Sequence, residues 1–160
     1  MTFLVRGARP DDAAAIAQLC AEFSAYLAAL GEPMPRSINA DEVLRDGFGG
    51  HPAFSAIVAE YDGRVVGYLL HHPGYDVVRG GRIWIIVDLF VTADARRAGV
   101  GRALMEHTRA ACRSSNNHAL VWAVHSRNMA AIAFYERLGA TFSDDLLVTW
   151  PADSERHLSF

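Results

Sequence analysis

Residues 83–101 read Ile83-Trp-Ile-Ile-Val-Asp-Leu-Phe-Val91-Thr-Ala-Asp-Ala-Arg-Arg-Ala-Gly-Val-Gly101. The first nine residues are apolar except for Asp88, as in a strand that is buried in a sheet. A glycine-containing turn flanked by arginines follows, and a helical pattern begins directly after it. Free backbone N–H groups and the helix dipole attract anions at such a helix start, and glycine lets a phosphate approach the backbone closely. The stretch therefore predicts a strand–turn–helix unit that binds a phosphorylated cofactor at Arg96–Gly101.

The spacing of the glycines narrows the class of cofactor. A dinucleotide fingerprint requires Gly-x-Gly-x-x-Gly/Ala, but Leu104 stands at its third position after Gly99 and Gly101. A nucleoside-triphosphate loop requires Gly-Lys-Ser/Thr, and the chain has no such run. The pattern that remains is Arg96-x-x-Gly99-x-Gly101, and its place between a strand and a helix strengthens the interpretation as a cofactor site.

A second motif lies downstream, between Asn128 and Gly139. Asn128 is a good N-cap and Gly139 a good helix stop, so the interval predicts a helix of about three turns. At 100° per residue, Asn128, Ile132 and Tyr135 fall on one face of it. Taken alone, Tyr135 fits an ordinary core aromatic. Together with the upstream turn, the shared face favours a binding site.

Both motifs resemble the GNAT superfamily of N-acetyltransferases. Arg96-x-x-Gly99-x-Gly101 matches its Arg/Gln-x-x-Gly-x-Gly/Ala turn, and Asn128-x-x-Ala131-x-x-Phe134-Tyr135-x-x-x-Gly139-Ala140 matches the second half of its cofactor site. Four further stretches are similar to the diamine (spermidine/spermine and thialysine) acetyltransferase branch, in that branch's order. They are Asp46-Gly-Phe-Gly-Gly-His-Pro52, Val58-Ala-Glu60, Gly74-Tyr-Asp76 and Asp88-Leu-Phe-Val91.

The resemblance implies an α/β (mixed α+β) fold with about four helices. Its central mixed sheet has six to seven strands, of which two splay apart at the cofactor. Periodicity and turn residues place helices at 11–30, 40–46, 100–113 and 128–138, and strands at 3–9, 55–60, 65–71, 83–91, 120–124 and 140–150. Gly47 is the expected helix stop, and Pro73-Gly74 is an expected loop. We expect one acetyltransferase domain over residues 1–152 and a C-terminal tail over 153–160.

By the same resemblance, the cofactor is acetyl-CoA and Tyr135 is the general acid beside its sulfur. Backbone groups at Leu89, Phe90 and Val91 would hold the acetyl carbonyl and the upper pantetheine, and Asn128 the pantetheine. The pyrophosphate would bind to the turn, which consists of Arg96, Arg97, Ala98, Gly99, Val100, Gly101 and Arg102. The resemblance also implies a homodimer, for which the sequence itself offers little beyond apolar residues such as Trp150.

The substrate side of the site is less defined. Asp88 is the one charge in its strand, so it requires a partner or a wet cavity. A structural hydrogen bond to a neighbouring loop and a substrate contact explain it equally well. Tyr26, His125, Glu22 and His71 could relay a proton, but no spacing singles one out. The diamine branch has a glutamate where Val87 stands and an acid where Leu146-Leu147 stands. A smaller or less basic amine, diamine- or amino-acid-like, therefore fits better than spermidine or spermine.

Composition excludes several classes of function. The chain has 160 residues, 51% of them hydrophobic, and a net charge of −3, which indicates one globular domain and no nucleic-acid partner. No apolar stretch is long enough for a membrane span and no signal peptide is visible, so a cytoplasmic location is expected. Cys20 and Cys112 fit buried, reduced thiols. The seven histidines have no ligand spacing, so no metal is expected.

The leading hypothesis is an enzyme that moves acetyl from acetyl-CoA to a primary amine of a small molecule by direct attack. One alternative is a protein or peptide N-acetyltransferase, which would need a groove left open by the loop at 31–37. Another is a non-catalytic acyl-CoA sensor on the same fold. The presence of Tyr135 argues against the sensor, because a binding module has no need for an acid at the sulfur.

Overall fold

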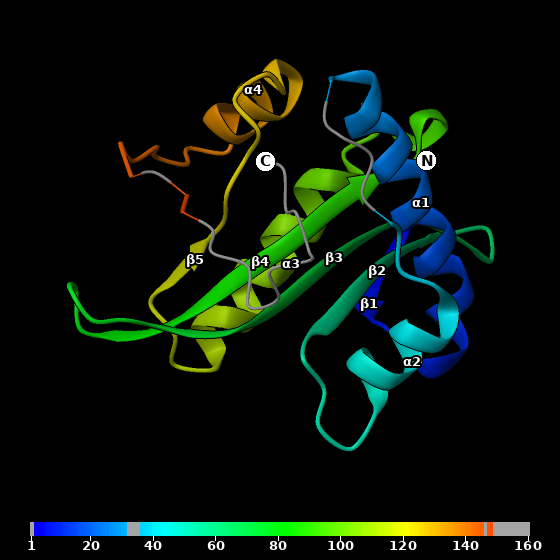
Figure 1. The fold of residues 1–160 in the computed structure, drawn as a ribbon, viewed down its shortest axis with the longest axis horizontal. Coiled ribbons are helices and arrows are strands. Elements are labelled where there is room, and N and C mark those ends of the chain that lie inside the picture. Colours follow the sequence, from blue (N-terminus) through cyan, green and yellow to red (C-terminus); the bar gives the residue numbers. More distant parts are fainter. Residues whose placement is uncertain (1, 32–35, 146, 149–160) are drawn as a thin grey trace.

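The computed structural model describes residues 2–31, 36–145 and 147–148, and it has the mixed α/β architecture that the sequence predicts (Figure 1). Its strands form one sheet in the order β1-β2-β3-β4-β5. Neighbours are antiparallel from β1 to β4, and β5 is parallel to β4. The strands are β1 (Leu4–Gly7), β2 (Ser55–Tyr61), β3 (Arg64–Asp76), β4 (Gly81–Val91) and β5 (Ala119–Val121). The helices are α1 (Ala13–Ala29), α2 (Ala40–Phe48), α3 (Val100–Ser114) and α4 (Met129–Arg137).

Both faces of the sheet are covered by helices, with α1 and α2 in front and α3 behind in Figure 1. Alternate residues of β2 show this directly. Val58 packs into a core cluster with Ile16 and Val43, while Ile57 and Ala59 pack into another with Leu104. Because successive side chains of a strand point to opposite faces, a strand covered on both sides reads as a continuous apolar run.

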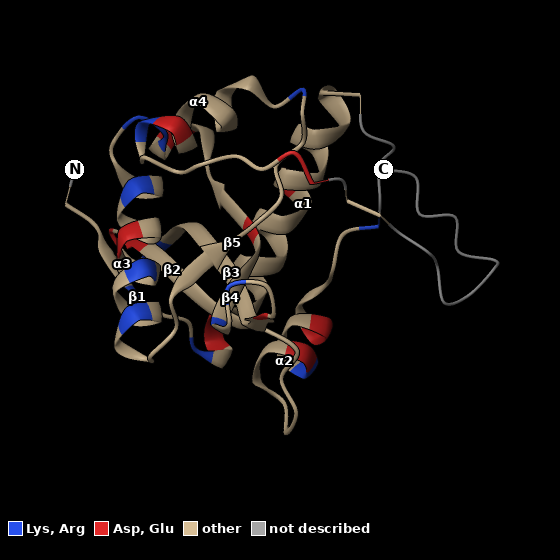
Figure 2. Ribbon diagram, turned by 90° about the vertical axis from the view of Figure 1, so that its left-hand side faces the viewer, with Lys and Arg blue, Asp and Glu red and all other residues tan. Residues whose placement is uncertain are grey.

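The helix after the glycine turn has the predicted amphipathic pattern. Val100, Leu104 and Thr108 are buried against the sheet, together with Met105 and Cys112. Arg102, Glu106, Arg109 and Arg113 are exposed, and Figure 2 shows basic residues along the outer side of α3. Ala111, which the pattern also places inside, is only half-buried.

Two boundaries differ from the sequence prediction because of tertiary contacts. β3 runs through Pro73 and Gly74, where a loop is expected. The pairing with β2 ends at the pair of Ser55 and His71, so the next part of β3 is a sheet edge, where proline costs no ladder hydrogen bond. α2 continues through Gly47, and the Phe54 ring packs so closely there that a Cβ on Gly47 would lie 2.8 Å from it.

The number of strands is also lower than predicted, with five among the described residues instead of six to seven. The strand expected over 120–124 is confined to Ala119–Val121. Residues 140–145, 147 and 148 of the last expected strand are not in a strand, and Phe142, Leu147 and Val148 are 52%, 71% and 85% exposed. Apolar alternation stabilises a strand only when one face is buried. The rest of that stretch, with Leu146 and Trp150, and the expected tail lie outside the described residues.

Candidate functional site

The pairing between the two parallel strands stops halfway along β4. β5 pairs with Ile83, Trp84 and Ile85, while β4 continues to Val91. Among the described residues, no strand pairs with the β5-facing edge of β4 from residue 86 to 91. The predicted splay is therefore present. An exposed strand edge offers N–H and C=O groups to an extended ligand, as in strand addition by a peptide.

The free edge leads into the predicted anion cradle. Gly99 is the N-cap of α3 with φ of 88°, a left-handed conformation that favours glycine. No atom outside its chain neighbours lies within 4 Å of the position of a Cβ on Gly99, so the backbone there is open to a ligand. The first N–H groups of α3 have no partner within the helix. The turn therefore fits a phosphate group, as the sequence predicts.

The arginines of the turn have different surroundings. Arg96 lies back against the end of β4, with Nε donating to the Val91 carbonyl oxygen at 3.0 Å. Its guanidinium lies 5.1 Å from the centre of the Tyr26 ring and 5.3 Å from that of Phe90. Arg102 donates to Glu106 and to the Arg137 carbonyl oxygen, both at 3.2 Å. Arg97 is exposed and has a positive φ of 64°.

The second motif lies across the splay from the unpaired part of β4, residues 86–91, and we call the region between them the groove. Asn128 caps α4, and its Oδ1 accepts hydrogen bonds from the Ala131 backbone N–H at 3.2 Å and from the Tyr26 hydroxyl at 3.0 Å. Gly139, with φ of 79°, follows the end of the helix. Helices α3 and α4 meet closely, since a Cβ on Gly101 would stand 3.4 Å from the Phe134 ring. The two motifs, 30 residues apart, thus face one site.

Tyr135 is buried between aromatic rings on this side of the groove. Its ring centre lies 5.0 Å from that of Trp122 and 5.2 Å from that of Phe134. Burial, and then the nearby charge of Asp88, raises the pKa of Tyr135 to about 12. Its hydroxyl forms no hydrogen bond with any residue that the structure describes. The phenol is therefore protonated near neutral pH and available to donate a proton.

Asp88 is largely enclosed on β4 and accepts a hydrogen bond from the hydroxyl of Tyr68 on β3. Burial raises the pKa of Asp88 to about 7, although the hydrogen bonds from Tyr68 and from the Leu89 backbone oppose this. Tyr68 is fully buried, and burial followed by the Asp88 charge raises its pKa strongly. Burial also raises the pKa of the adjacent Cys20 to about 11. The structural hydrogen bond is thus present, but its donor, Tyr68, lies on the neighbouring strand β3 and not on a loop.

Tyr68 is the residue of this cluster that the sequence did not predict. Its only signal in the sequence is that it is the one phenol in the apolar strand expected over 65–71. That strand precedes the strand in which Asp88 is the one carboxylate. The contact depends on the register of β3 and β4, in which Leu70 pairs with Asp88 but His71 pairs with Ile86. This irregularity leaves Val87 without a partner on β3, and its side chain is 55% exposed beside Asp88.

The other substrate candidates lie in structural positions. His125 Nδ1 accepts from the Arg127 backbone N–H at 3.1 Å in the turn before α4. His71 is buried and stacks on Trp84 at 4.1 Å between ring centres, and burial lowers its pKa. Glu22 lies on the exposed side of α1, where Gln18 donates to it at 3.4 Å. In the described ranges, no three His, Cys, Asp or Glu side chains could together hold a metal ion.

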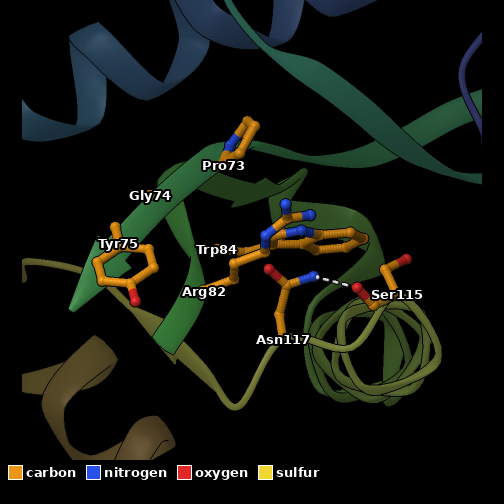
Figure 3. A pocket seen from close by; sticks show the side chains of 7 residues that line it. All are labelled: Pro73, Gly74, Tyr75, Arg82, Trp84, Ser115 and Asn117. Carbon is orange, nitrogen blue, oxygen red and sulfur yellow. Dashed lines mark hydrogen bonds between the residues drawn. The ribbon is translucent and has the colours of Figure 1, made fainter. Parts of the chain in front are cut away.

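A hollow lies away from this groove, between the β3–β4 hairpin and the end of α3 (Figure 3). It has a volume of about 370 Å³ and is lined by Pro73, Gly74, Tyr75, Arg82, Trp84, Ser115 and Asn117. None of these is a predicted site residue. The Asn117 side chain donates to the Ser115 carbonyl oxygen at 3.0 Å. The splayed groove, and not this hollow, gathers the predicted chemistry. None of the described helices could span a bilayer.

Known proteins have sequences similar to this chain. The model of the Acetyltransferase (GNAT) family matches residues 18–140. The uncharacterized N-acetyltransferase YhfO of Bacillus subtilis is 27% identical over 135 residues, which are 84% of this chain and 87% of that protein. The human spermidine/spermine N(1)-acetyltransferase-like protein 1 is 26% identical over 145 residues. That match covers 86% of this chain and 20% of the human protein.

Solved structures show the same fold. An integron cassette protein from the mobile metagenome of V. cholerae superimposes with a TM-score of 0.78 at 19% sequence identity. The match covers 96% of this chain and 94% of that one. The family match spans both halves of the groove, from α1 to the end of α4. The chain therefore belongs to the GNAT family of acetyltransferases and is an N-acetyltransferase of the EC 2.3.1 acyltransferase class.

Proposed function

We propose that this enzyme transfers acetyl from acetyl-CoA to a primary amine of a small molecule by direct attack. The observation that carries this proposal is the free edge of β4, which ends at the open N-terminus of α3 and faces Tyr135 across the splay. An extended amide chain with phosphates at one end and a thioester at the other fits this arrangement. GNAT enzymes in general use acetyl-CoA, which has this chemical structure.

The chain's own groups divide the binding between them. Backbone groups of Leu89, Phe90 and Val91 would hold the acetyl carbonyl and the upper arm of the cofactor. The phosphates would lie at the turn formed by Arg96, Arg97, Ala98, Gly99, Val100, Gly101 and Arg102, and Asn128 would bind the middle of the arm. The bound cofactor supplies the thioester that the amine attacks.

Tyr135 is the proposed general acid. A thiolate leaving group has an ordinary pKa near ~8.5, whereas burial keeps the Tyr135 hydroxyl protonated with a pKa of about 12. The phenol therefore keeps its proton at neutral pH and would supply it to the thiolate that leaves. Because no described residue binds the hydroxyl, its donor is free for that contact.

Asp88 is the proposed acceptor of the proton from the amine. An alkyl ammonium has a pKa near ~10.4, so an ordinary carboxylate is too weak a base to deprotonate it efficiently. The pKa of about 7 makes Asp88 a stronger base that is still partly ionised at neutral pH. We therefore expect kcat/KM to rise with pH through about 7, as the carboxyl ionises.

The acceptor amine would meet Val87, which is apolar and exposed beside Asp88. The diamine branch carries a glutamate there, so we propose a smaller or less basic acceptor, diamine- or amino-acid-like, in place of spermidine or spermine. The name of the human relative refers to those polyamines. Comparing a small amine with spermidine as acceptors therefore tests the proposal directly.

The test is thiol release from acetyl-CoA across a panel of polyamines, amino acids, aminoglycosides and a peptide, with mass spectrometry of the acetylated product. We expect the highest kcat/KM with a small amine. Thiol release with the peptide alone would show a protein N-acetyltransferase instead. No acetylated product from any acceptor, and no binding of acetyl-CoA, would refute the proposal.

Val87→Glu tests the choice of acceptor. Adding a carboxylate should shift the ratio of kcat/KM towards spermidine by roughly 1–3 kcal/mol, if the new charge is partly buried. Leu4→Glu is the matched control, since Leu4 is 58% exposed on β1, at the far edge of the sheet, and Val87 is 55% exposed. A wild-type enzyme that prefers spermidine to every smaller amine would contradict the idea.

A further inference from the structure

One side chain of α1, Tyr26, joins the two cofactor motifs across the groove. Its hydroxyl donates to Asn128 Oδ1 at 3.0 Å, at the start of α4. Its ring carries the Arg96 guanidinium at 5.1 Å from the ring centre, in the turn before α3. Both partners are proposed cofactor contacts. The end of α1 and the start of α4 lie at the same end of the molecule in Figure 1.

The hydroxyl of Tyr26 gives the Asn128 amide a second hydrogen bond that fixes its orientation. Asn128 Oδ1 accepts both from Tyr26 and from the Ala131 backbone N–H at 3.2 Å, which uses the two lone pairs of the oxygen. The amide nitrogen donates to none of the acceptors that the structure describes. Without the phenol, the amide would keep only one hydrogen bond to fix its orientation. With it, Asn128 presents an N–H donor.

The ring of Tyr26 has a separate effect on Arg96. The guanidinium lies over Tyr26 and also over Phe90, 5.3 Å from its centre, while Nε donates to the Val91 carbonyl oxygen at 3.0 Å. These contacts hold a long, entropy-rich side chain at the mouth of the groove. An arginine placed in this way loses less conformational entropy when it binds a phosphate.

The residue that follows α1 also lies near the segment before α4. Gly31, which follows α1 with φ of 91°, lies against the segment before α4. A Cβ there would stand 2.8 Å from Arg127 Nη1. The Arg127 side chain therefore approaches the end of α1 close to the bond from Tyr26 to Asn128.

We propose that Tyr26 is a positioning residue for coenzyme A. Its hydroxyl turns the Asn128 amide so that an N–H donor meets a carbonyl oxygen of the cofactor arm, and its ring supports Arg96 for the phosphates. This inference rests on the proposed function. It assigns Tyr26 to the cofactor, in contrast to its earlier place among the substrate candidates.

The two effects of Tyr26 can be separated with two variants and two ligands. Tyr26→Phe keeps the ring under Arg96 and removes the bond to Asn128, while Tyr26→Leu removes both. Dissociation constants are measured by calorimetry for coenzyme A and for adenosine 3′,5′-bisphosphate, which has phosphates but no arm. Tyr75→Phe is the control, because Tyr75 is 65% exposed on the distant hairpin.

We expect Tyr26→Phe to weaken coenzyme A binding roughly 3- to 10-fold, the usual range for one hydrogen bond, and to leave the bisphosphate unchanged. Tyr26→Leu should weaken both ligands, and Tyr75→Phe neither. In an Asn128→Asp background, which keeps the helix cap but has no amide donor, Tyr26→Phe should have little further effect.

Equal coenzyme A affinity in wild type and Tyr26→Phe would overturn the positioning role. Tighter binding by Tyr26→Phe would also overturn it, since the bond would then obstruct the groove and compete with the cofactor. A wild-type protein that binds neither ligand would refute the proposed function itself, and this inference with it. Melting temperatures of the variants show whether each one is folded.

Discussion

The charge of Asp88 between pH 4 and 7 depends on folding. In the unfolded chain its carboxyl has the ordinary pKa of 3.8, and in the folded enzyme burial raises that pKa to about 7. Below pH 3.8 both states are protonated. Between pH 3.8 and 7 the folded chain keeps a proton that the unfolded chain has lost, so the free energy of unfolding falls as pH rises. Above about pH 7 both states are ionised and the loss is complete.

Asp88→Asn should therefore stabilise the protein at high pH. The gap in free energy of unfolding between variant and wild type should widen from pH 4 to 7 and level off above it, reaching on the order of 4 kcal/mol. Urea denaturation at several pH values measures this gap. Asp145→Asn, at an exposed position, is the control. A gap that stays constant with pH would show that folding does not raise the pKa of Asp88.

Tyr135→Phe tests the role of the phenol. The variant should lose turnover by on the order of 10²-fold or more, the range for a lost acid catalyst. It should keep its melting temperature and its coenzyme A affinity, because the ring stays in place and the hydroxyl has no described partner. Steady-state kinetics and thermal unfolding together measure these effects. Unchanged turnover, with chemistry rate-limiting, would make Tyr135 a core aromatic only.

At the scale of elements, the turn between β4 and α3 is the cofactor's proposed anchor. Gly99→Glu should abolish the rise in melting temperature that acetyl-CoA produces, because a negative charge would stand among the phosphates. Gly63→Glu is a matched control in the β2–β3 turn. Gly63 has a similar φ of 75° and equally open surroundings, so both variants carry the same backbone strain. Only Gly99→Glu should lose the rise in melting temperature with acetyl-CoA. Loss of the rise in both variants would indicate a folding defect instead.

Elements with their signals in nearby residues could be predicted from the sequence. α4 begins and ends as Asn128 and Gly139 indicate, because caps act within a few residues. The cradle at Gly99 and the alternation of α3 are local in the same way. The extension of β3 through Pro73 and the passage of α2 through Gly47 depend on distant strands and on Phe54, so local patterns could not show them.

Within the site, too, local motifs could be predicted from the sequence and contacts between distant residues could not. The turn and the capping asparagine were visible as motifs. The bond from Tyr68 to Asp88 depends on a register irregularity between two strands, and the stacking of Arg96 on Tyr26 joins residues 70 positions apart. Contacts of this kind follow from packing of the whole sheet, which periodicity does not describe.

At the scale of the molecule, we propose a homodimer, as the resemblance to diamine acetyltransferases implies. Tyr75, Val77 and Val78 at the hairpin tip are 65%, 84% and 93% exposed, which leaves an apolar tip in water in the isolated chain. Trp150 lies outside the described residues. Light scattering should give twice the chain mass of 17.5 kDa at micromolar concentration. A mass of 17.5 kDa would exclude a dimer under those conditions.

The unpaired part of β4 also bears on how the protein behaves at high concentration. A row of free N–H and C=O groups on an apolar strand is a template on which a strand of another molecule can add, the first step of aggregation. Among the described residues, no strand or helix pairs with the β5-facing edge of β4 beyond Ile85. A ligand lying along that edge would shield it. Coenzyme A should therefore delay the onset of turbidity on heating, and the ligand-free enzyme should be the form that precipitates on storage.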